Sequence, residues 1–449
     1  MSCIVRSIDG RRDLLAPAAA FAERYPALLE SVTRGSAHAR YDILFAFPQS
    51  TLTLTSDGRV HAPDGRVQDG RFLDALDTAW RAERLPHSLD DGLPFHGGWV
   101  ILLAYELAAE IEPTLRLHRS DIMPVALAVR CPAAIIVDHV HDRTILVAES
   151  GQAALLDEME TDLATVSEIA QLAPPAGIEE DAPARFLDGV ARIHEHLQAG
   201  DLFQANLSRA WHARFIEAPS AASLYAALRR ANPAPFAGLL QQNAWAVISS
   251  SPERLVQVRR GMAQTRPIAG TRPRLAGDDE LARIRELTAH PKERAEHVML
   301  IDLERNDLGR VCKPGTVEVN ELMVVESYAH VHHIVSNVRG RLREGVTPGQ
   351  VIAATFPGGT ITGCPKVRCM EIIAALEDAP RGAYTGALGY LDRNGDLDLN
   401  ILIRTLTLHG HEVTLRAGAG IVADSDALKE LDETRAKARG MLRALGETG

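Results

Sequence analysis

The sequence predicts a mixed α and β fold of the size of an enzyme. Strand-like runs and amphipathic helical segments alternate along its 449 residues, and no internal repeat or low-complexity tract interrupts them. Hydrophobic residues make up 46%, charged residues 24% and aromatic residues 5%, which is ordinary usage for a globular protein. One hydrophobic core seldom serves a chain this long, so we expect two cores, or one large sheet-rich body with a subdomain.

The first part of the chain reads mainly as sheet. Its β-rich runs are separated by polar turn segments such as SDG and APDG, and they lie at Tyr41 to Phe47, Trp99 to Leu103, Ala126 to Val137 and Thr144 to Val147. The stretch QLAPPAGIEEDAPAR is rich in proline, alanine and acidic residues and has no periodicity. We therefore predict an N-terminal subdomain over residues 1–170, a linker over 171–185 and a second region over 186–449.

Strands and helices alternate after the linker. The expected strands are Ala244 to Ile248, Val317 to Val319, Ala387 to Leu391 and Val413 to Ala417. The expected helices are Leu187 to Leu197, Pro291 to Arg305, Pro365 to Leu376 and Asp426 to Leu445. The last helix has the clearest signal, because Ser425 or Asp426 can cap it and its leucines follow one face.

Charge and cysteine usage exclude several classes of protein. Lys plus Arg number 48 against 59 Asp plus Glu, and the net charge of −11 argues against a nucleic-acid or anionic-membrane partner. The longest apolar stretch, Val125 to Val137, is short and contains Arg130, and the N-terminus lacks the apolar core of an export signal. Five cysteines without C-x-x-C spacing fit a reducing compartment. We expect a cytoplasmic protein in which local cations meet any small anionic ligand.

Two glycine-rich strings resemble nucleotide-binding motifs, and neither fits. In GGTITGCPK, Cys364 and Pro365 separate the last glycine from the lysine that a P-loop requires directly after it. The string from Gly418 to Ala423 follows an expected strand and precedes a helix, as in a dinucleotide fold. The chain ends after that helix, so no second strand completes the unit. Backbone N–H groups beside a carboxylate ligand would explain these glycines better.

Two helical segments carry paired carboxylates at i and i+3. Glu293 and Glu296 lie in HPKERAEH, and Glu430 and Glu433 lie in LKELDETRAK. Either pair alone usually marks a solvated face, since like charges on one helix are slightly unfavourable. If the two helices converge, four carboxylates would form a hard oxygen site suited to Mg²⁺.

Nine blocks, in order, resemble the chorismate-binding family, whose members include the large subunits of aminodeoxychorismate synthase and anthranilate synthase. The blocks are SSSPERL, RPIAGTRPR, KERAEHVMLIDLERNDLGRV, HHIVSNVRG, FPGGTITGCPK, RGAYTGALGY, LNILIRTL, RAGAGIVADS and ELDETRAKA. They span about Gly200 to Ala438, and YPALLES and RYDILFAF resemble the family's first subdomain more loosely. The resemblance implies an α+β fold of two large β-sheets packed face to face with helices outside. It also implies that residues 186–449 form the chorismate-binding catalytic region.

The resemblance implies a Mg²⁺ site made by the paired carboxylates. Glu296 and Glu433 would be direct ligands, and Glu293 and Glu430 would act through metal-bound water. The metal would hold the ring carboxylate of chorismate. Lys437, one turn after Glu433, would be a further partner of that carboxylate, although a lone lysine on a helix is ordinarily a surface cation.

The remaining substrate contacts are implied in the same way. The amides of Gly418, Ala419 and Gly420 would also bind the ring carboxylate. Arg404 and Tyr384 resemble the pair that grips the enolpyruvyl carboxylate, through the two-pronged guanidinium and the phenol hydroxyl. Without the family, Arg404 would read as a structural ion pair and Tyr384 as a strand residue.

The residues that act on the ring come from four other blocks. Thr360 resembles the residue that touches the C4 hydroxyl, and His333 the histidine beside the ring, although a histidine between apolar residues is usually a core residue. Gly270 and Thr271 belong to a substrate-binding block. Glu253 in SPER resembles the general acid, a role that needs a carboxyl group of raised pKa.

Gln204 indicates amination. Relatives that hydrate chorismate carry at this position a lysine that activates water, and a glutamine cannot act as that base. Ammonia needs little deprotonation before it attacks. The reaction implied is amination with ammonia or a glutamine amidotransferase subunit, because the chain has no Gly-x-Cys-x-Gly nucleophile of its own.

The sequence leaves two sites of amination open. QANLSR, SPER, GGTITG and Asn400 favour the 4-aminating branch, towards 4-aminobenzoate and folate, with a separate lyase downstream. Ala269 favours the 2-aminating branch, towards anthranilate and tryptophan, because many 4-aminating enzymes carry a lysine there. Leu28 to Ser31 resemble part of a tryptophan feedback site, or else form a short apolar helix end, and Phe236 departs from the usual partner block. We expect 4-amination, with anthranilate synthase component I as the alternative.

A third hypothesis belongs to another class of protein. The chain could be a non-catalytic regulator that binds chorismate or tryptophan. The intact carboxylate pairs and Glu253 argue against this, because binding alone needs no proton donor.

Overall fold

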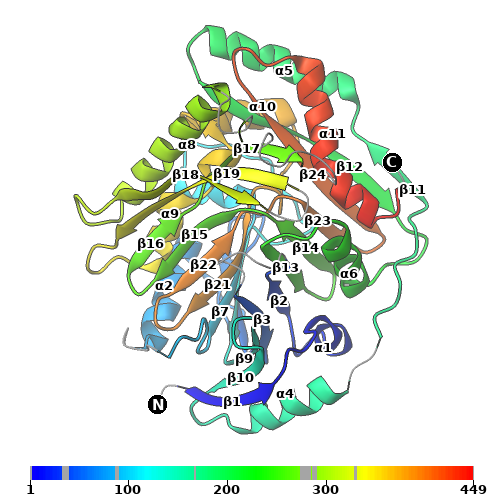
Figure 1. The fold of residues 1–449 in the computed structure, drawn as a ribbon, viewed down its shortest axis with the longest axis vertical. Coiled ribbons are helices and arrows are strands. Elements are labelled where there is room, and N and C mark those ends of the chain that lie inside the picture. Colours follow the sequence, from blue (N-terminus) through cyan, green and yellow to red (C-terminus); the bar gives the residue numbers. More distant parts are fainter. Residues whose placement is uncertain are drawn as a thin grey trace.

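Two large antiparallel β-sheets lie face to face, with helices on the outside (Figure 1). The computed structural model describes residues 3–32, 40–85, 91–165, 168–273, 285, 291–327 and 331–447, without the side chains of residues 269, 271–273, 291–293 and 331. This arrangement confirms the α+β fold that the family resemblance implies.

The first sheet, sheet A, is built from both ends of the chain. Its order is β1 (Cys3–Asp9), β10 (Arg143–Glu149), β9 (Ala133–Asp138), β3 (Tyr41–Ala46), β2 (Ala27–Glu30), β13 (Phe236–Gln241), β14 (Trp245–Ser251), β23 (Thr405–His409), β24 (Glu412–Ile421), β12 (Gln204–Arg214) and β11 (Gly177–Glu180), and the short β20 (Gly363–Cys364) also pairs with β12. The strand β2 joins the N-terminal strands to the later ones by pairing with β13.

The second sheet, sheet B, is interleaved in the same way. Its order is β17 (Ile268–Pro273), β19 (Val331–Arg341), β16 (Met262–Thr265), β15 (Arg254–Arg259), β22 (Leu397–Asn400), β21 (Ala387–Asp392), β7 (Gly98–Leu103), β8 (Ala126–Cys131), β4 (Ser50–Leu54), β5 (Val60–His61) and β6 (Val67–Gln68), and β18 (Glu318–Ser327) pairs with β19. Here β7 pairs with β21, about 290 residues later in the chain.

The helices cover the outer faces of the sheets. They are α1 (Leu15–Ala20), α2 (Phe72–Glu83), α3 (Ala108–Ile111), α4 (Ala154–Ala164), α5 (Pro183–Gln198), α6 (Ala221–Ala231), α8 (Pro291–Gly309), α9 (Pro348–Thr355), α10 (Lys366–Glu377) and α11 (Ala427–Ala444), with single 3₁₀ turns η1 (Tyr105–Leu107) and η2 (Gly359–Ile361). The side chain of Asp426 caps α11 by accepting from the N–H groups of Leu428 and Lys429, as the sequence predicts.

Apolar side chains fill the space between the sheets and under the helices. Phe45 from sheet A and Leu102 and Leu388 from sheet B belong to one buried cluster between the two sheets. A second cluster lies between sheet B and α2, α8 and α9, and a third between sheet A and α1, α4, α6 and α11. Each strand between two such layers is buried on both faces, which explains the uninterrupted apolar runs in the sequence.

The predicted elements and the observed ones differ where polar residues are buried. The strand runs before residue 150 are confirmed, except that Ala126 to Val137 forms two strands, β8 and β9. The long strands β12 and β19 were not predicted, because QANLSRAWHAR and VHHIVSNVRGR bury polar side chains and break the alternation expected of strands. Leu28 to Ser31 is not a helix end, since β2 spans most of it.

The expected linker over 171–185 contains ordered structure. The strand β11 pairs with the end of β12, and α5 begins at Pro183, three residues before the expected start at Phe186. Strands from residues 3–149 and from residues 177–421 alternate in both sheets. The division into 1–170 and 186–449 stays a prediction about the sequence.

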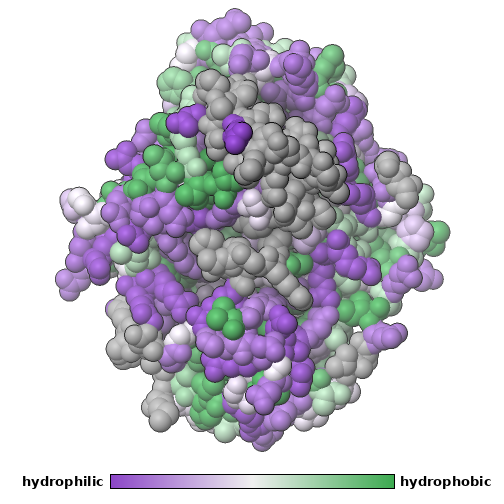
Figure 2. Space-filling model, in the orientation of Figure 1, coloured by the Kyte–Doolittle hydropathy of each residue, from purple (hydrophilic) through white to green (hydrophobic). Residues whose placement is uncertain are grey.

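The face shown in Figure 2 is largely hydrophilic wherever it is coloured, with only small apolar patches. Among the described residues, no helix is long and apolar enough to cross a membrane.

Candidate active site

The glycines of the RAGAG block lie inside a strand. The sequence places Gly418, Ala419 and Gly420 after a strand, and that expectation is wrong, because β24 continues to Ile421. In the antiparallel register with β12, Gly418 lies opposite Ser208, Ala419 opposite Leu207 and Gly420 opposite Asn206.

The register also fixes which of these amides face a ligand. Ser208 N donates to Glu377 Oε1 at 2.9 Å and Asn206 N donates to Thr362 O at 2.9 Å, so both point away from β24. In an antiparallel pair of strands, when the main-chain N–H and C=O of one residue point outward, those of the residue directly opposite also point outward. Gly418 and Gly420 therefore present their main-chain groups on the side opposite β12, while the amide of Ala419 is used within the sheet.

The contacts of Lys437 agree with this outward orientation of the Gly418 main chain. Its Nζ donates to Gly418 O at 2.9 Å and forms an ion pair with Glu433 Oε1 at 2.6 Å. The lysine and glutamate of α11 thus lie beside the free edge of β24. A cation, two amides and a carboxylate stand together, as the family resemblance implies.

The absence of side chains at the two glycines makes room for three polar groups. A Cβ on Gly418 would overlap Asn206 Oδ1 and would lie 2.7 Å from the hydroxyl of Tyr384. A Cβ on Gly420 would lie 2.6 Å from Gln204 Nε2. The side chains of Asn206, Tyr384 and Gln204 are therefore packed over bare backbone.

We expect Gly418→Ala to reduce chorismate turnover sharply, because the new methyl group must displace Asn206 or Tyr384. Overpacking of this kind costs about 1–3 kcal/mol of stability, so activity and thermal unfolding should be measured together. Gly177→Ala is the matched control, since a Cβ at that position meets nothing within 4 Å. Unchanged turnover in Gly418→Ala would contradict the placement of substrate beside this glycine.

Two buried polar atoms near these glycines make no hydrogen bond within the described structure. They are Gln204 Oε1 and Asn206 Oδ1. A buried polar group left unsatisfied costs about 1–3 kcal/mol, so native proteins seldom keep one without a role. A polar ligand that binds here would satisfy them.

Arg404 is a partly buried cation with an unusual backbone. Its φ is 53°, in the left-handed region that costs a residue with a side chain about 1–3 kcal/mol. Burial lowers the pKa of Arg404, and the nearby Tyr384, Glu253 and Glu433 oppose that shift. The structure thus brings Arg404 and Tyr384 together, and a carboxylate from a ligand would compensate the buried guanidinium.

Glu253 has the properties of a proton donor. It is 6% exposed, and burial raises its pKa to about 7, while Thr360, Arg404 and Lys437 act in the opposite direction. Glu253 N donates to Ser251 Oγ at 3.2 Å and Ile401 N donates to Glu253 O at 3.0 Å, which hold the backbone at this turn. A carboxyl group that titrates near neutral pH is suited to general acid catalysis.

His333 lies on β19, in the same cluster. Burial lowers the pKa of His333 to about 4, with a further contribution from Arg404, so the imidazole is neutral at physiological pH. Gly270 on β17 interacts with it through the backbone and has a φ of 70°. The side chain of Thr271 lies outside the described residues.

The two carboxylate helices border this cluster from different sides. The helix α8 packs against β17 and η2, and η2 carries Thr360, which lies near Glu253. On α11, Glu433 lies close enough to Arg404 to oppose the lowering of the arginine's pKa by burial. Glu430 Oε1 accepts from Ser425 Oγ at 2.6 Å, and the side chain of Glu293 lies outside the described residues.

The donor chemistry of these helices fits Mg²⁺. Among the described residues, no three His, Cys, Asp or Glu side chains converge as a ready-made metal cage. Protein sites for Mg²⁺ usually supply one or two carboxylates and leave the other positions to water and substrate oxygens. Two direct ligands, Glu296 and Glu433, are what such a site would require.

One acidic residue at the site was not predicted. Glu304 on α8 is 7% exposed, and burial next to Asp307 raises its pKa to about 8. Its neighbours include Thr265, Lys366 and Glu253. Glu304 lies in the DLERNDLGRV block, on the helix α8 that packs on η2. Its role could not be recognised from the sequence, because an isolated glutamate in a helix is ordinarily a surface charge.

A separate cavity lies at the position of the possible feedback site. Its volume is about 250 Å³, and Leu29, Glu30 and Ser31 line it together with Phe236. Ser31 Oγ donates to Pro235 O at 3.0 Å, so the two blocks that the sequence pairs are in contact.

Comparisons with known proteins point to one family. A family model described as chorismate binding enzyme matches residues 28–443. An anthranilate synthase component I-like protein from Synechocystis sp. is 43% identical over 381 residues, which are 83% of this chain and 78% of that protein. Aminodeoxychorismate synthase component 1 from Bacillus subtilis is 38% identical over 444 residues, 94% and 92% of the two chains. The crystal structure of anthranilate synthase component I from Streptococcus pneumoniae matches with a TM-score of 0.81 at 32% identity, over 91% of this chain and 93% of that one.

Proposed function

Because the chain belongs to the family of chorismate-binding enzymes, we propose that it aminates chorismate to 4-amino-4-deoxychorismate, with Mg²⁺ and with ammonia from a glutaminase partner. The observation that carries the proposal is the cluster formed by the partly buried cation Arg404, the raised-pKa carboxyl of Glu253 and the main-chain groups of Gly418 and Gly420.

The cluster offers a separate partner for each carboxylate of chorismate. Arg404 and the hydroxyl of Tyr384 would bind the enolpyruvyl carboxylate. Lys437 and the amides of Gly418 and Gly420 would bind the ring carboxylate, supported by Mg²⁺ on Glu296 and Glu433. Bound Mg²⁺ would supply positive charge that fixes and polarises the substrate. Two anchors at opposite ends would orient the ring for reaction.

Glu253 would then assist departure of the C4 hydroxyl. As the C–O bond breaks, the protonated carboxyl gives its proton to the leaving oxygen, which departs as water. The lone pair of ammonia forms the new C–N bond, and the resulting ammonium loses a proton. The neutral His333 and Thr360 would contact the reacting part of the ring, and the amide of Gln204 would leave water without a base.

Asn400, whose resemblance to the 4-aminating relatives favours that branch, has a structural role. Asn400 Oδ1 accepts from Leu388 N at 2.9 Å and its Nδ2 donates to Phe236 O at 2.9 Å, so this residue ties sheet B to β13 of sheet A. The alternative is anthranilate synthase component I, which Ala269 on β17 favours. Relatives of both kinds match the chain at similar identity.

One assay separates the two reactions. Purified chain is incubated with chorismate, Mg²⁺ and an ammonium salt, and the products are resolved by chromatography. An intermediate that becomes 4-aminobenzoate only after a lyase is added supports 4-amination. Anthranilate released together with pyruvate supports the alternative, and no consumption of chorismate under any condition would refute both.

We expect Ala269→Lys to retain or raise 4-amination, because a lysine at this position would supply a nucleophile to C2 before ammonia enters at C4. The ratio of 4-aminobenzoate, formed with added lyase, to anthranilate is the measurement. A variant that makes only anthranilate would contradict the proposed branch.

The pH dependence should report the protonation of Glu253. The acid must be protonated, and its pKa is about 7, so kcat/KM is expected to be level at lower pH and to fall as pH rises above about 7, approaching tenfold per pH unit. The profile must be measured at a constant concentration of free ammonia, since ammonium itself deprotonates as pH rises. A rate that increases through pH 7 under those conditions would exclude Glu253 as the acid.

A further inference from the structure

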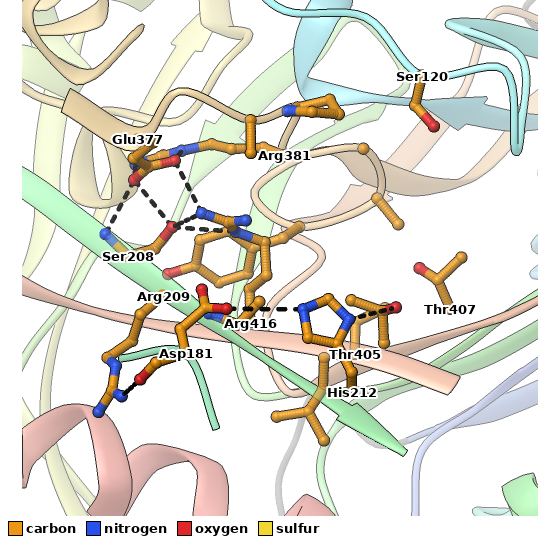
Figure 3. A pocket seen from close by; sticks show the side chains of 18 of the residues that line it. Ser120, Asp181, Ser208, Arg209, His212, Glu377, Arg381, Thr405, Thr407 and Arg416 are labelled. Carbon is orange, nitrogen blue, oxygen red and sulfur yellow. Dashed lines mark hydrogen bonds and ion pairs between the residues drawn. The ribbon is translucent and has the colours of Figure 1, made fainter. Parts of the chain in front are cut away.

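A second cavity lies against sheet A, with Ser208, His212 and Arg416 among its lining residues (Figure 3). Its volume is about 290 Å³, which suits a small ligand rather than a dinucleotide. Side chains from β12, β23, β24 and the end of α10 line it. Tyr384 belongs to the lining, whereas Arg404, Glu253 and Gly418 do not.

The inner wall of this cavity is a carboxylate held by two arginines. Glu377 accepts from Arg381 Nε at 2.9 Å and Nη2 at 2.6 Å, from Arg416 Nη2 at 3.1 Å, and from Ser208 N and Oγ at 2.9 and 2.8 Å. These partners outweigh burial and lower the pKa of Glu377, so it is ionised. One carboxylate thus faces two guanidinium groups, and one positive charge is left over.

Arg416 has hydrogen-bond donors that the cluster does not use. Arg381 uses its remaining donors on Ile361 O, Thr385 Oγ1 and Asn206 O. Arg416 uses Nε and Nη2 on Ser208 Oγ and Glu377, and its Nη1 makes no hydrogen bond or ion pair within the described structure. Its side chain is 10% exposed and lines the cavity, so Nη1 offers two N–H groups to whatever enters.

One further acidic side chain of the lining interacts with Arg416. The charge of Arg416 helps to lower the pKa of Asp181, whose Oδ2 already accepts from Ala210 N at 2.8 Å and whose Oδ1 lies 3.6 Å from His212 Nε2. The hydrogen bond to Asp181 raises the pKa of His212, which adds partial positive charge. Two of the four lining arginines pair with carboxylates outside the lining, Arg185 with Asp378 and Arg209 with Glu180. The cavity therefore offers an anion the free donors of Arg416 Nη1 rather than a net positive charge.

Part of the remaining lining is apolar. It includes Ile122, Met123, Phe186, Leu376, Pro380 and Ala383, next to polar residues such as Ser120, Thr407 and His409. Phe186 and the ring of Tyr384 can pack against a flat ligand. The cavity therefore has a cation with free donors at one end and apolar side chains at the other. These two features match a ligand in which an anionic group is attached to a ring.

We propose that this cavity binds a small aromatic carboxylate, with the carboxylate on Arg416 Nη1 and the ring among Phe186, Leu376 and Tyr384. The site differs from the candidate active site, and its occupancy does not depend on which carbon of chorismate is aminated. A bidentate or single charged hydrogen bond to Arg416 would fix the ligand's orientation.

Benzoate is the probe for this site, and its binding to the full chain can be followed by isothermal titration calorimetry. Benzoate should bind the wild type, whereas benzamide, which lacks the charge, and acetate and inorganic phosphate, which lack the ring, should bind at least about tenfold more weakly. Equal binding of acetate or phosphate would overturn the assignment of an aromatic ligand.

Three variants locate the binding. Arg416→Gln should weaken benzoate about tenfold or more, since it removes a charged hydrogen bond but leaves Arg381 on Glu377. Arg6→Gln removes the same charge from β1, at the far edge of sheet A and outside the cavity, and should leave the affinity unchanged. Arg404→Gln alters only the candidate active site and should also leave benzoate binding unchanged.

The opposite pattern would overturn the proposal. Benzoate that binds Arg416→Gln as tightly as the wild type, or that loses its affinity in Arg404→Gln, would place the ligand elsewhere. An equal loss in Arg6→Gln would show general electrostatic attraction. If Arg416→Gln does not fold, Thr407→Phe fills the cavity and keeps every arginine contact, and benzoate must then fail to bind.

Discussion

Glu433→Gln is expected to abolish Mg²⁺-dependent turnover of chorismate while the protein stays folded. A neutral amide is a much poorer ligand for Mg²⁺ than a carboxylate. Replacing groups that only support a metal ligand already costs about 10–100-fold, so the loss in kcat/KM should be at least about a hundredfold. Activity is measured against Mg²⁺ concentration, and Mg²⁺ binding is measured separately by calorimetry.

The fold should tolerate this change. The side chain of Glu433 is 48% exposed, and its ion pair with Lys437 is of the surface kind, worth about 0–1 kcal/mol. Asp432→Asn is the matched control, because Asp432 is 74% exposed and forms a surface ion pair with Arg435 on the same helix. Full activity in Glu433→Gln at ordinary Mg²⁺ concentrations would remove the metal assignment.

Glu253→Gln should reduce kcat by about 10²–10⁴-fold, the usual contribution of a general acid. Glutamine has nearly the same shape but cannot deliver a proton to the leaving hydroxyl. Binding of chorismate, measured by fluorescence or calorimetry in the absence of ammonia, should persist because Arg404, Tyr384 and Lys437 are unchanged. A variant that keeps wild-type kcat would rule out this acid.

Glu253→Gln should also change how the free energy of unfolding depends on pH. The pKa of Glu253 rises from 4.5 to about 7 on folding, so the wild type loses the corresponding stability as pH rises from about 4.5 through 7. Glu253→Gln should lack this loss and should be relatively more stable than the wild type above pH 7. Glu318→Gln, at an exposed position paired with Arg339, serves as the control and should change neither kcat nor this pH dependence.

Sequence periodicity predicts the apolar elements well. Runs such as Trp99 to Leu103 and Ala387 to Leu391 are buried on both faces, and their composition alone shows it. The capped final helix is predicted almost to the residue, because its cap and its apolar face agree. Which strands become neighbours could not be predicted, since the β7–β21 pairing depends on contacts distant in sequence.

The site was predicted through motifs, and the structure adds geometry that the motifs lack. The positions of Glu253, Arg404 and Lys437 come from the family resemblance, whereas their proximity comes from the meeting of β24, α11 and the SPER turn. Asn206 and Glu304 were missed because a buried polar residue in a strand or helix looks like a surface residue until its surroundings are known.

The alternation of early and late strands in both sheets bears on how the chain reaches its native state. Because β2 pairs with β13 and β7 pairs with β21, neither sheet can be completed until most of the polypeptide has been synthesised. Such high contact order slows folding and leaves strand edges exposed on the ribosome. Fragments cut near residue 170 should therefore aggregate when expressed alone, and recover only if both pieces are refolded together.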